Sequence, residues 1–170
     1  YSCKEHLKKP SKEIFDTLEA CGVRVKLDDS DNTPGWKFNE YEMKGVPVRL
    51  EIGPRDIENN VATAVRRDTH EKVQLNLDNI ATELNSLLAE IQSNMLAQAE
   101  KNLNDAIVET NDFDTMVESV NAGKVALAYH CGDSACEDEI KQKTTIKTRV
   151  IQEYDTKHKC IYCGKPSRYK

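Results

Sequence analysis

The sequence predicts an α/β protein of two modules joined by one long helix. Three observations support this prediction. Near the N-terminus a helical pattern ends in glycine and passes into an alternating strand pattern. An apolar stripe of helical period runs through the middle of the chain, and two pairs of cysteines lie near the C-terminus. These patterns are typical of a helix and sheet module, a connecting helix and a small metal-stabilised module.

The first element is a helix followed by a strand. Ile14 and Leu18 recur at helical spacing within residues 11–21, and Gly22 is suited to end the helix. Residues 23–27 then alternate apolar and polar side chains, which predicts a strand. This order is the repeating unit of an α/β domain.

The next segment predicts a second helix, a half-buried strand and a hairpin. Trp36 opens a short amphipathic segment, and apolar residues alternate with polar ones through 46–52. Glycine and proline at 53–54 stop this strand and start a helical turn. Residues 61–75 are extended in character, and the Asp-Thr-His sequence at 68–70 predicts a turn between two strands.

The ends of these elements bring together aromatic, cationic and anionic side chains, namely Phe38, Glu42, Arg49, Arg55 and Asp56. An aromatic ring can stack on an unpaired base, and a guanidinium can donate two parallel hydrogen bonds to guanine O6 and N7. A carboxylate can accept from the ring N–H and the amino group of guanine. The same residue types also fit an ordinary strand edge with solvated charges, and taken alone they favour that interpretation.

A long apolar stripe predicts a helix over residues 78–110. Its members recur at intervals of three and four: Leu77, Ile80, Leu84, Leu87, Leu88, Ile91, Met95, Ala99, Leu103 and Ile107. We expect the stripe to be buried against the sheets of the two modules. A further amphipathic helix ended by Gly123 and a buried strand at 125–129 follow.

Cysteine organises the C-terminal module. Four residues separate Cys131 from Cys136, and two separate Cys160 from Cys163, which are spacings of zinc ligands. Two disulfides, or a redox enzyme that uses the Cys-x-x-Cys pair, are the competing interpretations. Because four thiolates fill a tetrahedral site, the zinc would be structural.

Other side chains near these pairs have simpler interpretations. His130 and His158 could each replace one cysteine ligand, but four cysteines suffice. Cys21 is expected to be a small buried side chain at a helix end.

Composition and charge narrow the function. The chain has 170 residues, 38% hydrophobic and 31% charged, and it contains no apolar run of the roughly 20 residues that cross a bilayer. The net charge of −5 argues against an indiscriminate nucleic-acid binder. Residues 76–140 carry 2 basic and 13 acidic side chains, whereas 141–170 carry 9 and 2. An RNA footprint would therefore avoid the acidic middle.

The chain resembles the C-terminal part of prolyl-tRNA synthetases of the eukaryote- and archaea-like group. The resemblance covers residues 4–170 and rests on the block from Asp-Asn-Thr-Pro-Gly-Trp-Lys-Phe to Gly-Pro-Arg-Asp, the His-Cys-Gly-Asp segment and the distal Cys-x-x-Cys-Gly-Lys-Pro. It implies a mixed-sheet class II anticodon-binding domain at 1–76 whose first strand would precede Tyr1. A connecting helix at 77–110 and a small α+β zinc-binding domain at 111–170 would follow.

The resemblance also implies a function. Phe38, Glu42, Arg49, Arg55 and Asp56 fall where the family contacts the anticodon of tRNA(Pro), which ends in two guanines. The four cysteines would hold zinc. The parent enzyme, a cytoplasmic homodimer, would attach proline to tRNA(Pro), with ATP bound in an upstream catalytic domain. No catalytic residue, DNA partner or membrane partner is therefore expected within these residues.

The chain departs from the family pattern at several points. Ser30 stands where many members have arginine, and Tyr41 where many have tryptophan. The chain also stops at Lys170, short of the family's C-terminal tyrosine segment. The alternative function is a stand-alone zinc-stabilised RNA-binding protein, although Tyr1 in place of methionine predicts a piece of a longer protein.

Overall fold

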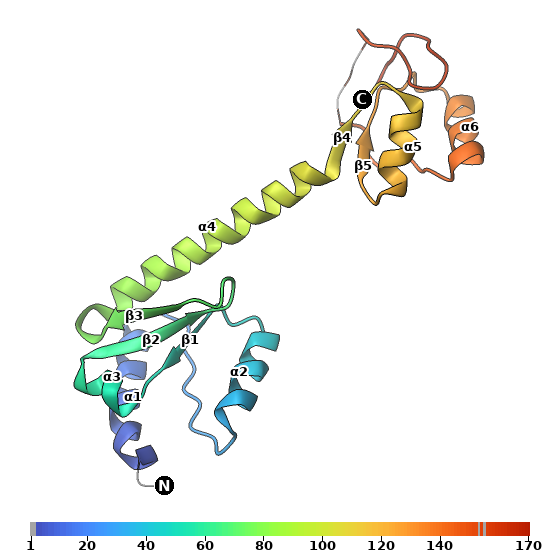
Figure 1. Ribbon diagram of the computed structural model, residues 1–170. Coiled ribbons are helices and arrows are strands. Elements are labelled where there is room, and N and C mark those ends of the chain that lie inside the picture. Colours follow the sequence, from blue (N-terminus) through green and yellow to red (C-terminus); the bar gives the residue numbers. More distant parts are fainter. Residues whose placement is uncertain (1–2, 153, 155) are drawn as a thin grey trace. The chain divides into compact units, whose positions relative to one another are not determined.

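The computed structural model describes residues 3–152, 154 and 156–170, and these form two compact units (Figure 1). The first extends to Ala97, and the second is Gln98–Lys170. The first contains a three-stranded antiparallel sheet and the second a two-stranded parallel sheet, each with helices, which confirms the α/β class. The predicted division into 1–76, 77–110 and 111–170 stays a prediction.

The first unit contains most of the regular structure. Its elements in chain order are α1 (Cys3–Ala20), α2 (Pro34–Met43), β1 (Val48–Glu51), α3 (Pro54–Glu58), β2 (Val61–Arg66), β3 (Lys72–Asn76), the 3₁₀ turn η1 (Leu77–Asn79) and the first part of α4 (Ile80–Ala106). Among the described residues, no helix is both long enough and apolar enough to cross a membrane.

The register of the sheet separates an apolar face from a polar one. Directly paired residues on neighbouring strands point to the same face. Leu50 pairs with Ala64, and Ala62 with Leu75, so these apolar side chains share one face. The opposite face carries the pairs Arg49 with Val65, Glu51 with Thr63, and Val65 with Lys72. The predicted half-buried strand therefore presents its charges on the face away from the core.

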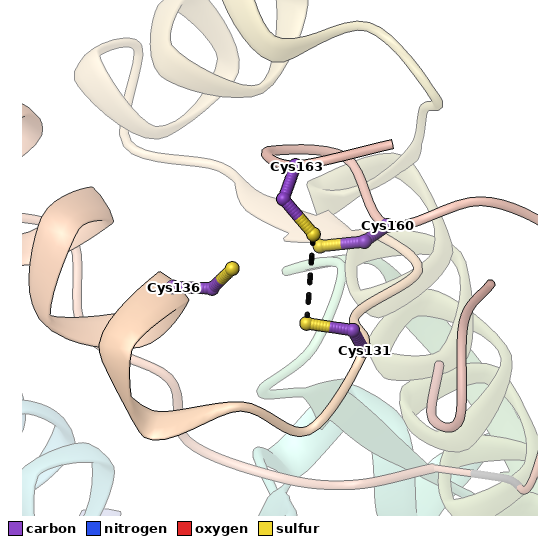
Figure 2. A group of neighbouring side chains, drawn as sticks. All are labelled: Cys131, Cys136, Cys160 and Cys163. Carbon is purple, nitrogen blue, oxygen red and sulfur yellow. Dashed lines mark hydrogen bonds between the residues drawn. The ribbon is translucent and has the colours of Figure 1, made fainter. Parts of the chain in front are cut away.

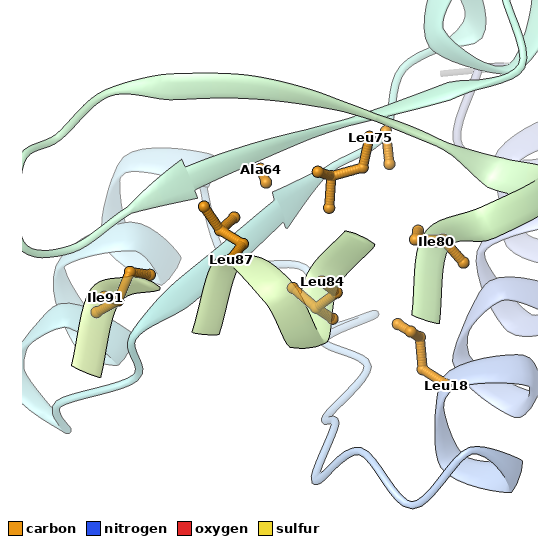
Figure 3. Packing of buried hydrophobic residues seen from close by; sticks show 8 residues of the cluster. Leu18, Ala64, Leu75, Ile80, Leu84, Leu87 and Ile91 are labelled. Carbon is orange, nitrogen blue, oxygen red and sulfur yellow. The ribbon is translucent and has the colours of Figure 1, made fainter. Parts of the chain in front are cut away.

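The core lies between the apolar face of the sheet and two helices (Figure 3). Its fully buried members are Leu18 from α1, Ala62, Ala64 and Leu75 from the sheet, and Ile80, Leu84, Leu87 and Ile91 from α4. Side chains four apart on a helix share one face, so the early part of the α4 stripe packs on the sheet as predicted.

Gly22 ends the α1 region as predicted, but the strand expected at residues 23–27 is absent. Gly22 has φ of +79°, and its N–H donates to the Glu19 carbonyl at 2.9 Å. Residues 23–27 belong to no strand, because none of the described segments pairs with them. Val25 still packs against the core, so the alternation reflects burial without a hydrogen-bonded ladder. The expected burial of Cys21 is also wrong, since this residue is exposed.

The segment from α2 to β3 matches its prediction closely. β1 follows α2 as expected, although it is limited to Val48–Glu51. Pro54 opens α3 directly after β1. The hairpin between β2 and β3 turns through His70, which adopts φ of +61°, and its N–H donates to the Arg66 carbonyl at 3.0 Å. In the chain, α2 therefore comes shortly before β1, and α3 begins shortly after β1 ends.

The long helix differs from its prediction in length and in burial. α4 ends at Ala106, and the β-branched residues that follow enter β4 (Ile107–Glu109) instead of extending the helix. Met95 and Leu103 are 49% and 61% exposed, so the expected burial of the stripe is wrong for its second half. Periodicity alone did not reveal where the packing partner ends.

The second unit places a parallel strand pair beside two short helices. Its further elements are α5 (Phe113–Asn121), β5 (Val125–Leu127) and α6 (Ser134–Thr144). Gly123 ends the α5 region with φ of +78°, as predicted. The expected buried strand is shorter, and Val125 is 60% exposed. The helix α6, capped by Asp133, was not anticipated.

Candidate functional sites

Arg49 is the centre of the first candidate site. Its guanidinium carbon lies 3.8 Å from the centroid of the Phe38 ring, which places the cation over the aromatic face. Its Nη1 donates to Glu42 Oε1 at 2.9 Å, and its Nε donates to Glu51 Oε1 at 3.0 Å. The sequence places Phe38 and Glu42 one helical turn apart on α2, so both face the same strand. The arginine is therefore held in one orientation.

The bonds of Arg49 leave specific atoms available. Nη2 of Arg49 and Oε2 of Glu42 make no hydrogen bond to any described residue. Glu42 is 40% exposed in its side chain, whereas Arg49 is only 21% exposed. Glu51 is also engaged by Lys72, whose Nζ lies 3.1 Å from Oε2. An open donor next to an open acceptor is the pattern that a guanine edge requires.

A shallow hollow surrounds this pair. Its lining residues come from α2, β1, the end of β2 and the segments next to them: Phe38, Tyr41, Glu42, Val46, Arg49, Val65, Arg66 and Arg67. Arg66 is 4% exposed and donates to both carboxylate oxygens of Asp68 and to Glu90. These bonds raise the pKa of Arg66, with Asp68 as the main cause, so this arginine has a structural role.

Arg55 and Asp56 follow the C-terminal end of β1, whereas α2 precedes its N-terminal end. Neither residue has a recorded contact with Phe38, Glu42 or Arg49. Asp56 Oδ2 accepts from the Gly53 N–H at 2.7 Å, and Oδ1 accepts from the Thr63 hydroxyl at 3.3 Å. The carboxylate thus closes the first turn of α3, as expected for an acid three residues after the N-cap. Arg55 is exposed. The structure brings together Phe38, Glu42 and Arg49, and not the whole predicted set.

The two family departures have local explanations. Ser30 donates through its hydroxyl to Asp28 Oδ1 at 2.6 Å, and Lys37 Nζ donates to the Asp28 and Ser30 carbonyls at 3.0 and 2.8 Å. The hydrogen bond from the Ser30 hydroxyl, and to a smaller extent that from Lys37, hold the pKa of Asp28 well below its usual value. Tyr41 keeps an aromatic ring in the hollow. The loop before α2 is therefore closed without an arginine at position 30.

The second candidate site is a cluster of four cysteine sulfurs (Figure 2). The Sγ atoms of Cys131, Cys136, Cys160 and Cys163 all lie within 4.8 Å of one another. Cys131 and Cys163 are 3.8 Å apart at sulfur, which is too far for a disulfide. Four thiolates about 2.3 Å from a central zinc are separated by roughly 3.8 Å in a tetrahedron. The cluster can therefore hold a metal ion.

Two glycine turns position these sulfurs. Gly132 and Gly164 adopt φ of +82° and +67° directly after Cys131 and Cys163. Cys136 lies in the first turn of α6, which Asp133 caps by accepting from the Ala135 N–H at 3.0 Å. Cys160 and Cys163 thus come from one tight turn, whereas Cys136 comes from the start of a helix that follows Cys131.

The pKa values of the cysteine thiols depend mainly on burial and on backbone N–H donors. The Lys165 backbone N–H donates to Cys163 and lowers the pKa of that thiol to about 7. Burial raises the pKa of Cys136 to about 12 and raises that of Cys131. A divalent cation would offset this burial cost, because metal ligands bind as thiolates.

The C-terminal residues close over the cysteine loop. A Cβ atom on Gly132 would lie 2.7 Å from the Tyr169 ring, so only glycine fits this contact. His130 donates its backbone N–H to the Tyr169 carbonyl at 2.8 Å. Its Nδ1 accepts from the Gly132 N–H at 3.0 Å, and His158 stacks on Tyr129 at 4.0 Å. Among the described residues the cluster consists of cysteines alone, as expected.

Comparison with known proteins finds two family models that match separate parts of the chain. A family model described as an anticodon binding domain matches residues 2–87, and one described as the C-terminal domain of prolyl-tRNA synthetase matches 113–170. A proline--tRNA ligase of Lachnospira eligens is 43% identical over 159 residues, which cover 92% of this chain and 33% of that protein. Proline--tRNA ligase 2 of Clostridioides difficile is 45% identical over 158 residues, covering 90% of this chain and 33% of the relative.

A solved structure shares the fold as well as the sequence. The prolyl-tRNA synthetase of Cryptosporidium parvum, complexed with L-proline and AMP, matches with a TM-score of 0.90 and 37% identity. The match covers 97% of this chain and 36% of that protein. The chain thus spans about a third of the length of the relatives that it matches.

Proposed function

We propose that this chain, which belongs to the prolyl-tRNA synthetase family through its anticodon-binding and C-terminal domains, recognises the anticodon of tRNA(Pro). The observation that carries this proposal is the orientation of Arg49 between Phe38, Glu42 and Glu51. A guanidinium fixed before the RNA arrives loses little conformational freedom on binding. It is suited to a guanine, and the proline anticodon ends in two of them.

The five predicted residues have different proposed roles in recognition. Arg49 donates through Nη2 to a guanine acceptor, while Glu42 accepts through Oε2 from the guanine N–H groups. Phe38 holds the Arg49 guanidinium through a cation–π contact with its ring. Arg55 is the exposed cation available to the second guanine. Asp56 acts as a positioning residue, because its bonds to Gly53 and Thr63 fix the turn that carries Arg55.

We propose that the metal held by Cys131, Cys136, Cys160 and Cys163 is zinc. The donor set of four sulfurs and the 3.8 Å sulfur separation support this assignment. With four protein ligands the ion would have no open position, so its contribution is to the folding of the second unit.

The activity of the whole protein is a further proposal. The curated relatives are named proline--tRNA ligases and are about three times as long as this chain. We assign the attachment of proline to tRNA(Pro), and the binding of ATP that it requires, to residues outside these 170. The parent enzyme is proposed to be a cytoplasmic homodimer, as the family resemblance implies.

Equilibrium binding to two anticodon stem-loops tests the proposed recognition. One RNA carries the proline anticodon, and the other has its two guanines replaced. The chain should bind the first more tightly, and Arg49→Ala or Arg55→Ala should each remove the part of that preference that comes from its own guanine, about 1–3 kcal/mol per base. Equal affinity of the unmodified chain for both RNAs would contradict the proposal.

A further inference from the structure

We propose that Arg67 is an additional RNA contact that binds a backbone phosphate of the anticodon loop. This inference rests on the proposed function and adds a residue that lies outside the five considered above. Arg67 lines the same hollow as Phe38, Glu42 and Arg49, and it is exposed at the end of the β2 segment. It is therefore close to the pair proposed to read a base.

Two backbone contacts orient this arginine. Its main-chain N–H donates to the Pro47 carbonyl at 3.0 Å, which fixes the position of the residue beside β1. Its side-chain Nε donates to the Glu42 carbonyl at 3.1 Å, in the last turn of α2. Carbonyls in the last turn of a helix carry partial negative charge and favour a cation. The bond uses only Nε and leaves both terminal nitrogens, Nη1 and Nη2, for a ligand.

Charge pairing distinguishes Arg67 from the other two arginines of the hollow. Arg49 pairs with Glu42 and Glu51, and Arg66 pairs with Asp68 and Glu90. No carboxylate in the described part of the chain pairs with Arg67. The rim of the hollow therefore carries one positive charge that the protein does not neutralise.

A phosphate is the ligand that best matches this arrangement. The planar end of a guanidinium presents two parallel N–H groups, which fit two oxygens of a phosphodiester. An exposed site at a rim suits the RNA backbone better than a base edge, because bases are read by desolvated contacts inside a pocket. The proposed base contacts of Arg49 and Glu42 would bring the adjoining backbone to this rim.

The test compares three variants of the full chain: Arg67→Ala, Arg67→Lys and, as a charge-matched control, Arg24→Ala. Arg24 is exposed in the 23–27 segment and does not line the hollow. Binding to both stem-loops is measured between about 50 and 200 mM salt, where phosphate contacts contribute strongly. Arg67→Ala should weaken binding to both RNAs by the same factor, about three- to ten-fold at the lower salt.

The salt dependence gives the second readout. Arg67→Ala should reduce the slope of log affinity against log salt by about 0.7, the value for one phosphate contact to a single strand. Arg67→Lys should keep the slope and lose part of the affinity, because lysine keeps the positive charge but lacks the two parallel N–H groups of the guanidinium. Arg24→Ala should change neither quantity. If Arg67→Ala does not fold, Arg67→Gln gives the same readout, since its amide can still donate to the Glu42 carbonyl.

Each contrary result has a distinct meaning. Unchanged affinity and slope for Arg67→Ala, with guanine preference intact in the unmodified chain, would overturn the Arg67 assignment alone. A loss confined to the guanine-containing loop would also overturn it, because the residue would then contact a base. Absence of guanine preference in the unmodified chain would instead contradict the proposed function, whatever the effect of Arg67.

Discussion

Replacement of Glu42 by glutamine separates recognition of guanine from general electrostatics. The substitution removes one negative charge from a surface that is proposed to bind RNA, so electrostatics alone would strengthen the complex. The structure predicts the opposite. Oε1 of Glu42 accepts from Arg49, and the amide oxygen of glutamine would take this position. The amide nitrogen would then replace Oε2 and direct a donor toward the donors of guanine.

The expected magnitude follows from the contacts that are lost. A well-placed set of hydrogen bonds to one base contributes about 1–3 kcal/mol of discrimination, so Glu42→Gln should weaken binding by about 5- to 150-fold. The fold itself should change little. Arg49 keeps its bond to Glu51 at 3.0 Å, and Glu42 is 40% exposed, so the stability lost is expected to be below about 1 kcal/mol.

The assay is equilibrium binding to the proline anticodon stem-loop and to its guanine-replaced counterpart at one fixed salt concentration. Glu40→Gln is the matched control, because Glu40 lies on the same helix, pairs with Lys44 and does not line the hollow. It should leave guanine preference unchanged. Unchanged or tighter binding of Glu42→Gln to the guanine-containing loop would refute the reasoning and make Glu42 a solvated helix residue.

Three further predictions concern stability. Cys160→Ser should lower zinc content and melting temperature together, whereas equal melting of metal-free and metal-loaded protein would contradict a structural ion. Gly132→Ala should destabilise the second unit by at least about 1 kcal/mol in denaturant titrations, because alanine disfavours φ of +82° and its Cβ would meet the Tyr169 ring. Gly164→Ala is the comparison, because a Cβ at Gly164 meets no neighbour. The hydrogen bonds from Arg66 lower the pKa of Asp68 in the folded protein. The ionised Asp68 therefore stabilises the fold fully above its unfolded pKa of about 3.9, and this stabilisation is lost as the pH falls through the folded pKa. Stability of Asp68→Asn should therefore vary less with pH below about 4, and identical acid unfolding profiles would argue against this.

The sequence predicted the elements whose signals are local. Gly22 and Gly123 both occupy left-handed positions after helices, and the turn at 68–70 joins two paired strands. The paired cysteine spacings likewise predicted a cluster that the structure brings within 4.8 Å. The glycine positions and the turn depend on a few adjacent residues, and each cysteine pair on a short spacing, so short-range sterics and ligand geometry determine them.

The features that were missed depend on partners distant in the sequence. Residues 23–27 alternate like a strand, but strand formation requires a neighbouring strand to pair with. Met95 and Leu103 continue an apolar stripe beyond the part of α4 that packs on the sheet. The RNA contact of Asp56 stays a prediction, and the structure adds that its carboxylate caps the first turn of α3.

The pairing of Arg49 with protein carboxylates is compatible with the proposed RNA recognition and would make that recognition selective. Two carboxylates and an aromatic ring neutralise and orient the guanidinium, so it offers little unspecific attraction to phosphate. The binding energy at Arg49 would then depend on the hydrogen-bonding pattern of the base. Arg49 alone would bind any base edge that carries acceptors, whereas Oε2 of Glu42 would repel an acceptor placed opposite it. A cation without this carboxylate would bind many RNAs. Under the proposed function, specificity for guanine would arise from the paired donor and acceptor, whereas affinity for the RNA backbone would come from cations, such as Arg67, that no carboxylate of the described residues pairs with.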